Sequence, residues 1–391
     1  MRLRLLIVST LDSKEPFGAF TRPFYLGQYL SEHFEVCQLG IDCSAVDYSA
    51  SKSIGARGLK TYITAVRQQI ERFNPDVVYA QETLPGIATL LATRFGSRKK
   101  PALVFDFHTL SANEYWTRLS VSANKLEVLK QFVKTYVAQG LLVFSGQPII
   151  GAGKPVVDDI KKWFGVSHAR IHCVGNGVPE DLLESTDSSQ NSDPASDPYQ
   201  TLRPAKIAVV VAPKTFQFPS NDMSADMTLD IANQLKKHDQ DLHFVVIGRE
   251  ETDITRPVPK NVTFTGFLPS RQDFVSHLKQ ADISLLPFPK EAVAGGARNK
   301  SLDFLACHNL VISTPEGMRG LAAFRNGEHL LISEDSVTSL ANTVLEACKN
   351  LAQYEPVVDA SVQKVQQEYS WQAKAENVAK IISDHYQQSQ Q

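Results

Sequence analysis

The residues with the clearest chemical potential lie within residues 294–321. Gly295 and Gly296 form a turn without side-chain bulk, so a ligand can approach the backbone closely. A helical pattern begins immediately afterwards and carries Arg298 and Lys300 in its first turn. Cations are unfavourable there, because the amino terminus of a helix is already positive. Two cations beside free N–H groups therefore predict a bound anion, of which phosphate is the most common.

Asp303 lies three residues after Lys300 and shares its helix face. A carboxylate one turn behind a phosphate site is placed to accept hydrogen bonds from a sugar diol such as ribose. In the alternative interpretation this segment is an ordinary βαβ corner, where Gly-Gly is only a turn and the charged residues form a solvated cluster of ion pairs. Spacing alone leaves both interpretations open.

The same stretch resembles the nucleotide-sugar motif of retaining glycosyltransferases of family 4, which have the GT-B fold. In one branch of that family the motif runs G-G-x-R-x-K-x-L-E-A-L-A-x-G-x-P-V-V-S-T-x-x-G-x-x-G-L. The matching residues are Gly295, Gly296, Arg298, Lys300, Leu302, Ala306, Val311, Ser313, Thr314, Gly317, Gly320 and Leu321. Asp303 stands where the family has Glu. The resemblance implies that Arg298 and Lys300 clamp the diphosphate of a nucleotide-sugar donor.

A chain of 391 residues is too long for one ordinary core and predicts two domains. Short β-branched runs alternate with helical patterns, which predicts α/β domains with parallel, doubly wound sheets. We expect strands at 3–9, 36–41, 77–80, 103–108, 141–145, 171–175, 207–212, 244–248, 262–266, 283–287, 310–314 and 330–333.

The expected architecture is GT-B, with two Rossmann-like domains facing each other across a cleft. Residues 1–183 would form an acceptor-binding domain, and residues 205–368 would form the nucleotide-sugar domain. Residues 184–204 are rich in Ser, Asp and Pro and are predicted to form a linker. Residues 369–391 continue a helical pattern that begins near residue 361, and the resemblance implies that this last helix crosses back to the first domain.

Several residues of the first domain are candidates for binding. Gly18 lies in the turn after the first strand, where the family has a glycine-rich loop near the donor. Asp106 and His108 end a buried strand, and the resemblance implies that this His hydrogen-bonds a hydroxyl of the donor sugar. Arg22 and Glu114 are candidate acceptor contacts, with a solvated helix start and a solvated loop charge as the alternatives.

The second domain adds three candidate donor contacts. Lys214 follows its first strand and is a third cation for the diphosphate. Many family members have G-R-L-x-x-x-K-G here, but this chain lacks that pattern, so the clamping falls to Arg298 and Lys300. Gly266 and Phe267 follow the third strand, where the family contacts the nucleotide base. Strand-end turns are the alternative interpretation for both.

Charge and cysteine content give weaker indications. Residues 1–180 hold 21 Lys and Arg against 15 Asp and Glu, whereas the remainder holds 19 against 27. The basic first half favours an anionic acceptor or an anionic membrane surface, with a mixed solvated surface as the alternative. The five cysteines are scattered without a Cys-x-x-Cys pair, which predicts a reducing cytoplasm and neither disulfides nor zinc. Residues 1–11 are expected to be the first strand and not a signal peptide.

The sequence therefore predicts a retaining, metal-independent glycosyltransferase that moves a sugar from a UDP- or GDP-linked donor to a saccharide or lipid-linked acceptor. No cofactor and no nucleic-acid partner are expected, and the location would be cytoplasmic or peripheral at the inner membrane face. The family's E-x7-E pattern is incomplete, because Gly295 occupies the position of the first acid. Two alternatives remain: a non-catalytic GT-B protein that binds a nucleotide or a partner, and a nucleotide-sugar epimerase of the same fold.

Overall fold

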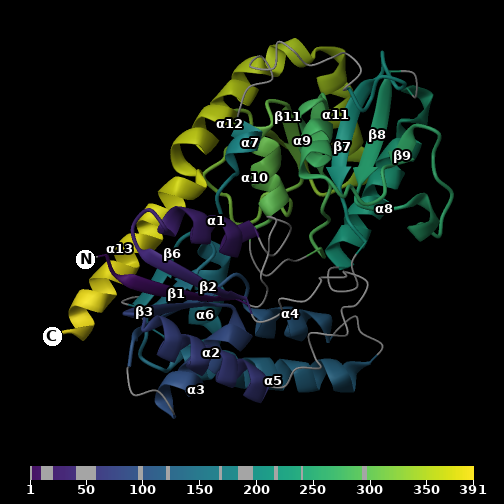
Figure 1. The fold of residues 1–391 in the computed structure, drawn as a ribbon. Helices are drawn as coiled ribbons and strands as arrows, with labels where there is room; N and C mark the ends of the chain where they lie inside the picture. Colours follow the sequence, from purple (N-terminus) through teal and green to yellow (C-terminus); the bar gives the residue numbers. More distant parts are fainter. Residues whose placement is uncertain are drawn as a thin grey trace. The chain divides into compact units, whose positions relative to one another are not determined.

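The computed structural model describes residues 2–9, 21–40, 59–95, 100–119, 124–166, 170–183, 197–214, 219–238, 241–292 and 297–391. The chain folds as two compact units (Figure 1). One unit comprises Met1–Gly177 and Trp371–Gln391, and the other comprises Val178–Ser370. Each unit contains a parallel sheet flanked by helices, as the strand–helix alternation predicts.

Among the described residues, the first unit has a six-stranded sheet in the order β2-β1-β3-β4-β5-β6. All its strand pairs are parallel. Its central strands are buried on both faces, because alternate residues of β1 enter two separate cores. The strands are β1 (Arg4–Ser9), β2 (Glu35–Gly40), β3 (Val77–Gln81), β4 (Ala102–Phe107), β5 (Ile149–Gly151) and β6 (Ile171–Cys173).

The helices of the first unit cover both faces of this sheet (Figure 1). They are α1 (Thr21–Leu30), α2 (Leu59–Phe73), α3 (Thr83–Arg94), α4 (Ser111–Arg118), α5 (Lys125–Val143), α6 (Lys154–Phe164) and α13 (Trp371–Ser389).

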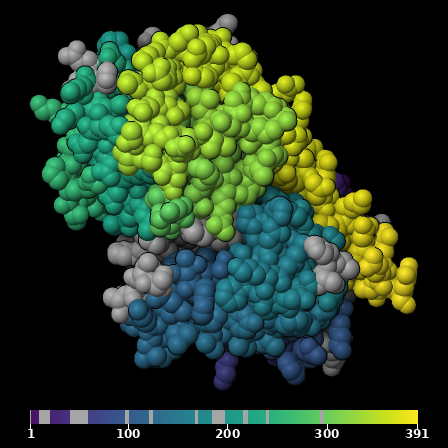
Figure 2. Space-filling model, turned by 180° about the vertical axis from the view of Figure 1, so that it is seen from behind, coloured from purple at the N-terminus to yellow at the C-terminus, as the bar shows by residue number. Residues whose placement is uncertain are grey.

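Helix α13 belongs to the first unit, although the second unit precedes it in sequence. Trp371 is 1% exposed and stacks on Tyr25 with ring centroids 5.6 Å apart. A Cβ atom at Gly177 would lie 2.8 Å from Trp371, so glycine is required for this close approach. Figure 2 shows α13, in yellow, running along the side of the first unit.

The second unit has a six-stranded parallel sheet in the order β12-β11-β10-β7-β8-β9, counted over the described ranges. Its strands are β7 (Lys206–Val211), β8 (Leu242–Ile247), β9 (Val262–Phe264), β10 (Ile283–Leu286), β11 (Leu310–Ser313) and β12 (Leu331–Ile332). Its helices are α7 (Glu180–Leu183), α8 (Pro219–Gln234), α9 (Arg271–Lys279), α10 (Asn299–Ala306), α11 (Val337–Lys349) and α12 (Glu355–Glu368), with 3-10 turns η6 (Lys236–His238), η7 (Glu251–Asp253) and η8 (Leu351–Tyr354). Two hydrophobic cores again enclose the sheet.

In each sheet the strand order reverses at one point. The reversal lies between β1 and β3 in the first unit and between β7 and β10 in the second. Open α/β sheets bind ligands beyond the carboxyl ends of the strands at such a point, because the two neighbouring connections leave in opposite directions. The residues after β1 and β3, and those after β7 and β10, are therefore the places to look for a site.

Two sequence expectations about secondary structure are wrong. Residues 141–145 form no strand, because α5 continues to Val143 and β5 lies later, at Ile149–Gly151. A short apolar run cannot be assigned to a strand or to a buried helix end from its pattern alone. The helix expected over 361–386 is two helices, since α12 ends at Glu368 and α13 begins at Trp371.

The described part of the predicted linker packs into the second unit. Tyr199 is 1% exposed and donates a hydrogen bond to the carbonyl of His277 at 2.7 Å. Arg203 pairs with Asp282, with 2.7 Å between Nη1 and Oδ2. Residues 178–183, which we expected in the first domain, also belong to the second unit.

Candidate active site

Arg298 occupies the N-cap position of α10, directly before its first helical residue. Its guanidinium carbon lies 3.8 Å from the ring centroid of Phe288, which follows strand β10. Nη2 donates to the carbonyl of Ala292 and, at 3.1 Å, to Oε1 of Glu316. Burial lowers the pKa of Arg298 to about 10, although Glu316 opposes this shift. The group remains a cation at neutral pH.

Lys300 reaches the carboxyl end of β7 from the first turn of α10. Its Nζ donates to the carbonyl of Val211 at 2.6 Å and to Oδ1 of Asn221 at 2.9 Å. The same ammonium lies 5.3 Å from the ring centroid of Phe288. Strand β7, strand β10 and helix α10 therefore meet at this side chain, at the reversal point of the second sheet.

The charge of Lys300 is sensitive to its surroundings. Burial lowers its pKa to about 7, and the nearby cations Arg298 and Arg249 lower it further, whereas Asp303 opposes them. An anion placed beside this group would favour its charged form. The side chain is thus suited to respond to a bound phosphate.

Asp303 lies one helical turn after Lys300 and is partly buried. Burial raises the pKa of its carboxyl to about 6, with Arg271 and Lys300 lowering it and Asp181 raising it. The group is therefore mostly ionised at pH 7 and able to accept hydrogen bonds. Its position on the same helix as Lys300 agrees with the face predicted from their spacing.

A third cation near this edge is Arg249, which the sequence analysis did not identify. It is 3% exposed, and its Nε donates to the carbonyl of Ala212 at 3.0 Å. Its Nη2 lies 2.5 Å from Oδ1 of Asp222, and Nζ of Lys214 lies 3.5 Å from the same oxygen. Lys214 is 42% exposed and remains accessible despite this ion pair.

Gly266 and Phe267 follow β9, further along the same edge of the sheet. Gly266 has φ +70°, and a Cβ atom there would lie 2.3 Å from Oε1 of Glu250. Its carbonyl accepts a hydrogen bond from Gly248 at 2.9 Å, and the carbonyl of Gly248 accepts one from Lys214 N at 3.1 Å. The ring of Phe267 is 58% exposed. Backbone hydrogen bonds thus connect Gly266 to the end of β7.

In the first unit, Asp106 and Arg22 form a buried pair. Arg22 Nη2 lies 2.8 Å from Asp106 Oδ2, and the hydroxyl of Tyr79 also donates to that oxygen. Arg22 further donates to the carbonyl of Gly175 at 3.1 Å and to Oδ1 of Asn176 at 3.2 Å. These partners occupy a guanidinium that is only 2% exposed, so a structural role accounts for Arg22.

His108 follows β4 and lies beside Glu82, which follows β3. Its Nδ1 lies 3.1 Å from Oε1 of Glu82, and its Nε2 is buried without a hydrogen-bond partner among the described residues. Burial lowers the pKa of His108 to about 4, with Arg22 adding to this shift and Asp106 opposing it, so the ring is neutral at pH 7. Nε2 lies 3.8 Å from Oδ1 of Asp106, which is too far for a hydrogen bond.

Glu82 is a functional candidate that the sequence analysis missed. Burial raises the pKa of its carboxyl to about 8, and the acids Asp106 and Glu114 raise it further. Its backbone has φ 77° and ψ 167°, a conformation that almost only glycine adopts. Such strain is concentrated at functional sites. In the sequence, the only indication for Glu82 is that an acidic residue follows a predicted buried strand.

Two further polar groups lie at the ends of β3 and β4. Glu114 falls in the first turn of helix α4 and not in a loop, and burial raises the pKa of its carboxyl. Gln81 ends β3 with 0% exposure, and neither polar atom of its amide has a hydrogen-bond partner within the described ranges. Together with His108 and Glu82, these groups form a polar cluster at the carboxyl ends of β3 and β4, next to the reversal point of the first sheet.

Three predicted site residues, Gly18, Gly295 and Gly296, lie outside the described residues. The described ranges contain no group of three or more His, Cys, Asp or Glu residues arranged to hold a metal ion. Within the same ranges, no helix is both long and apolar enough to cross a membrane.

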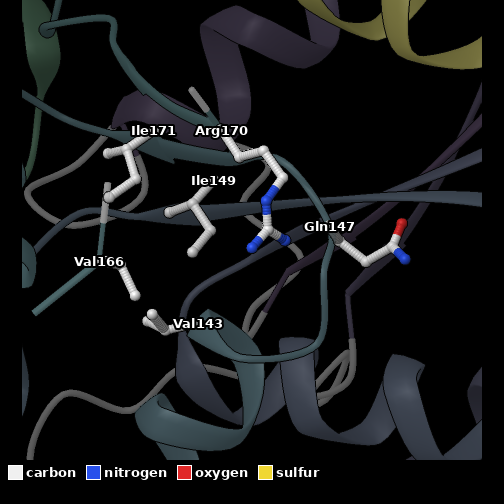
Figure 3. Close-up of a pocket in the computed structure, with 6 residues that line it drawn as sticks. All are labelled: Val143, Gln147, Ile149, Val166, Arg170 and Ile171. Carbon is white, nitrogen blue, oxygen red and sulfur yellow. The ribbon is translucent and has the colours of Figure 1, made fainter. Parts of the chain in front are cut away.

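The pocket in Figure 3 lies elsewhere, at the amino-terminal ends of β5 and β6. It is lined by Val143, Gln147, Ile149, Val166, Arg170 and Ile171. Because parallel sheets bind ligands at the opposite edge, this pocket does not belong to the candidate site.

Two family models match the chain. The model described as Glycosyltransferase Family 4 matches residues 41–182, and the model described as Glycosyl transferases group 1 matches residues 207–350. Together they cover more than half of the sequence. Among curated proteins, no sequence matches this chain.

Solved structures match over nearly the whole length. Sucrose-phosphate synthase from Thermosynechococcus elongatus is 11% identical, with a TM-score of 0.72 over 99% of this chain and 100% of that chain. HepE from Anabaena in complex with UDP-glucose is 13% identical, with a TM-score of 0.69 over 98% and 100%. Trehalose 6-phosphate synthase from Burkholderia multivorans is 10% identical, with a TM-score of 0.69 over 100% and 98%.

At such identities the structural likeness shows only the shared fold, and it confirms the predicted GT-B class. Each unit is a doubly wound, Rossmann-like domain, as expected. The family matches in both halves confirm the family predicted from residues 295–321. This chain belongs to the glycosyltransferases of family 4.

Proposed function

We propose that this glycosyltransferase moves a sugar, with retention of configuration, from a UDP- or GDP-linked donor to an acceptor hydroxyl. The observation that supports this proposal is the convergence of Arg298 and Lys300 over Phe288 at the start of α10. Two cations, the amino terminus of a helix and an aromatic ring at a strand-order reversal suit a diphosphate. Anabaena HepE, which shares the fold, has been solved with UDP and with UDP-glucose, which favours a uridine nucleotide.

The chemistry needs no metal in this proposal. The bond between the anomeric carbon and the diphosphate oxygen breaks, and negative charge develops on the departing diphosphate. Arg298 and Lys300 stabilise that charge. The acceptor oxygen forms the new bond from the same face of the sugar, and its proton passes to an oxygen of the donor phosphate. The products are a nucleoside diphosphate and a glycoside.

We assign the remaining predicted contacts by their chemistry. Asp303 accepts hydrogen bonds from the ribose, Lys214 adds charge near the diphosphate, and Gly266 and Phe267 contact the base. His108 offers Nε2 to a hydroxyl of the donor sugar. Glu114 is proposed as an acceptor contact, and the acceptor is a saccharide or a lipid-linked saccharide.

A cytoplasmic location fits this proposal. Four cysteines in the described ranges (Cys37, Cys173, Cys307 and Cys348) are free thiols, as in a reducing compartment.

Calorimetric titration of UDP and GDP without added metal tests the diphosphate site. We expect wild-type protein to bind one nucleotide, and Arg298→Ala/Lys300→Ala to lose binding by at least about 100-fold, since each charged hydrogen-bonding partner contributes roughly 1.5–3 kcal/mol. The matched control, Arg325→Ala/Lys349→Ala, removes one Arg and one Lys from exposed ion pairs in the same unit and should bind normally. Absence of binding to either nucleotide, or equal binding by both double variants, would contradict the proposal.

A second assay distinguishes sugar transfer from the non-catalytic alternative. A protein that only binds nucleotide would pass the calorimetric test but would consume no UDP-sugar or GDP-sugar in the presence of candidate acceptors. An epimerase would convert the donor sugar without releasing nucleotide. Release of free UDP or GDP that depends on Arg298 and Lys300 supports transfer over both alternatives.

A further inference from the structure

The outward face of helix α5 is apolar, although it faces solvent. The exposed apolar residues of this helix and of its C-cap, here called the α5 stripe, are Leu126, Leu129, Val133, Val137, Leu141 and Phe144. Their exposed fractions range from 42% to 66%. A surface helix normally presents polar residues to water, and a contiguous apolar patch marks a surface for interaction.

The opposite face of α5 is already used by the core of the first unit. Leu142 and Val143 are buried, and α5 packs beside α3 at the outer edge of the unit (Figure 1). The apolar stripe is therefore an addition to the core-facing surface of the helix. The part of this unit that the structure describes leaves the stripe uncovered.

The stripe keeps to one side of the helix. Successive members are 3, 4, 4, 4 and 3 residues apart, which averages to the helical period of about 3.6. A stripe that repeats every 3.5 residues would wind around the helix and favour a supercoiled partner helix. A stripe of period 3.6 stays on one line and fits a flat surface.

The charges beside the stripe are mostly positive. Helix α5 carries Lys125, Lys130 and Lys134, with Glu127 as its single acid. The unit that contains α5 holds 23 Lys and Arg against 16 Asp and Glu. Lysine side chains keep their charged ends in water while their stems cover apolar surface, so they suit the edge of a membrane contact.

Aromatic side chains extend the apolar surface. Trp116 of α4 is 53% exposed and lies against Phe132 of α5, with ring centroids 5.3 Å apart. Phe144 is 66% exposed at the other end of the helix. Tryptophan and phenylalanine are typical of helices that lie in the interface between lipid and water.

We propose that the α5 stripe docks the first unit on an anionic membrane surface. The helix would lie in the plane of the interface, with the stripe among the upper acyl chains and the lysines at the anionic headgroups. The one-sided stripe and the positive border favour a flat anionic surface over a second copy of the chain, because a second copy would bring like charges together.

Vesicle co-sedimentation of the full chain tests this proposal. Vesicles of equal parts phosphatidylglycerol and phosphatidylcholine should bind wild-type protein, with affinity falling as salt rises, and pure phosphatidylcholine should bind it much less. Lys130→Ala/Lys134→Ala should weaken binding to the anionic vesicles by about 30-fold, as expected for two lysines near the surface. The triple variant Leu129→Gln/Val133→Gln/Val137→Gln should bind the anionic vesicles at least about 30-fold more weakly than the wild type.

The matched control is Phe95→Gln, since Phe95 of the same unit is 73% exposed but lies outside the stripe. It should bind vesicles as the wild type does. Glutamine is a good helix former, so the stripe variant should keep the wild-type melting temperature. Failure of wild-type protein to bind anionic vesicles at low salt, or equal binding by the stripe variant, would overturn the proposal. Sedimentation velocity that shows a wild-type dimer, dissociated by the stripe substitutions without vesicle binding, would overturn it in favour of self-association.

Discussion

Nucleotide binding should be coupled to proton uptake at Lys300. Burial, with the charges of Arg298 and Arg249, lowers the pKa of this ammonium to about 7 in the free protein. A diphosphate beside it restores the preference for the charged form and raises the pKa toward the ordinary value near 10.5. The protein must therefore take up protons as the nucleotide binds.

The size of this effect depends on pH. With a pKa of about 7, roughly half of the Lys300 side chains are charged at pH 7 and about one in eleven at pH 8. Binding should take up about 0.5 proton at pH 7, about 0.9 at pH 8 and about 0.1 at pH 6. The affinity for UDP should fall about fivefold from pH 7 to pH 8, because a smaller share of the protein carries a charged Lys300.

Calorimetry at pH 8 measures the proton number directly. UDP is titrated in two non-phosphate buffers of different ionisation enthalpy, such as HEPES and Tris, and the difference in heat gives the protons taken up. The terminal phosphate of the nucleotide is already ionised at this pH, since its pKa is near 6. Lys300→Arg is the matched control, because arginine stays charged and should bind UDP with no proton uptake.

Two results would refute this reasoning. If wild-type protein bound UDP at pH 8 with no dependence of heat on buffer, Lys300 would not gain charge on binding. If Lys300→Arg bound UDP with the same uptake as the wild type, another group would be the source of the proton.

Three further predictions concern other parts of the molecule. His108→Ala should lower kcat by about 100-fold with a smaller change in KM, because Nε2 is proposed to hydrogen-bond the sugar as it reacts. Steady-state kinetics with the UDP-sugar measures both constants. A change confined to KM would argue against this role. Gly317→Ala should destabilise the second unit by about 1–3 kcal/mol. A Cβ atom there would lie 2.3 Å from Oγ of Ser313 and 2.8 Å from the carbonyl oxygen of Leu286. An unchanged midpoint of urea unfolding would refute the predicted clash. The folded-state pKa of Glu82, about 8, exceeds its ordinary value of 4.5, so wild-type stability should decline as pH rises from about 4.5 to 8. Glu82→Gln should escape this loss and gain about 3–4 kcal/mol relative to the wild type between pH 5 and pH 8 in urea unfolding. A difference that does not change with pH would show that the pKa of Glu82 is not raised in the folded protein.

The sequence reveals Arg298 and Lys300 because their local setting is unusual, with two cations in the first turn of a helix after a glycine pair. It does not reveal their partners. Val211 lies 89 residues from Lys300, and the two meet only because the strand order brings β7 beside β10. Spacing along the chain carries no information about such a contact.

For Arg22, the sequence does not show whether the side chain is exposed or buried. In the sequence it is a charged residue at a helix start, and both a solvated role and an acceptor contact suit that position. Its partner Asp106 lies 84 residues away at the end of a buried strand. Only the assembled sheet shows that the two charges neutralise each other in the core. The strained backbone of Glu82 is hidden for the same reason, since the residue type gives no sign of it.

Proton NMR of donor turnover tests the central claim most directly. UDP-glucose or GDP-mannose is incubated with wild-type protein, with Arg298→Ala/Lys300→Ala and with the control Arg325→Ala/Lys349→Ala, and the first anomer of the released or transferred sugar is recorded before mutarotation. A retaining transferase with its diphosphate site at the start of α10 predicts the α anomer first. It also predicts loss of turnover only in the Arg298 and Lys300 variant. A β anomer appearing first, or equal turnover by both double variants, would contradict it.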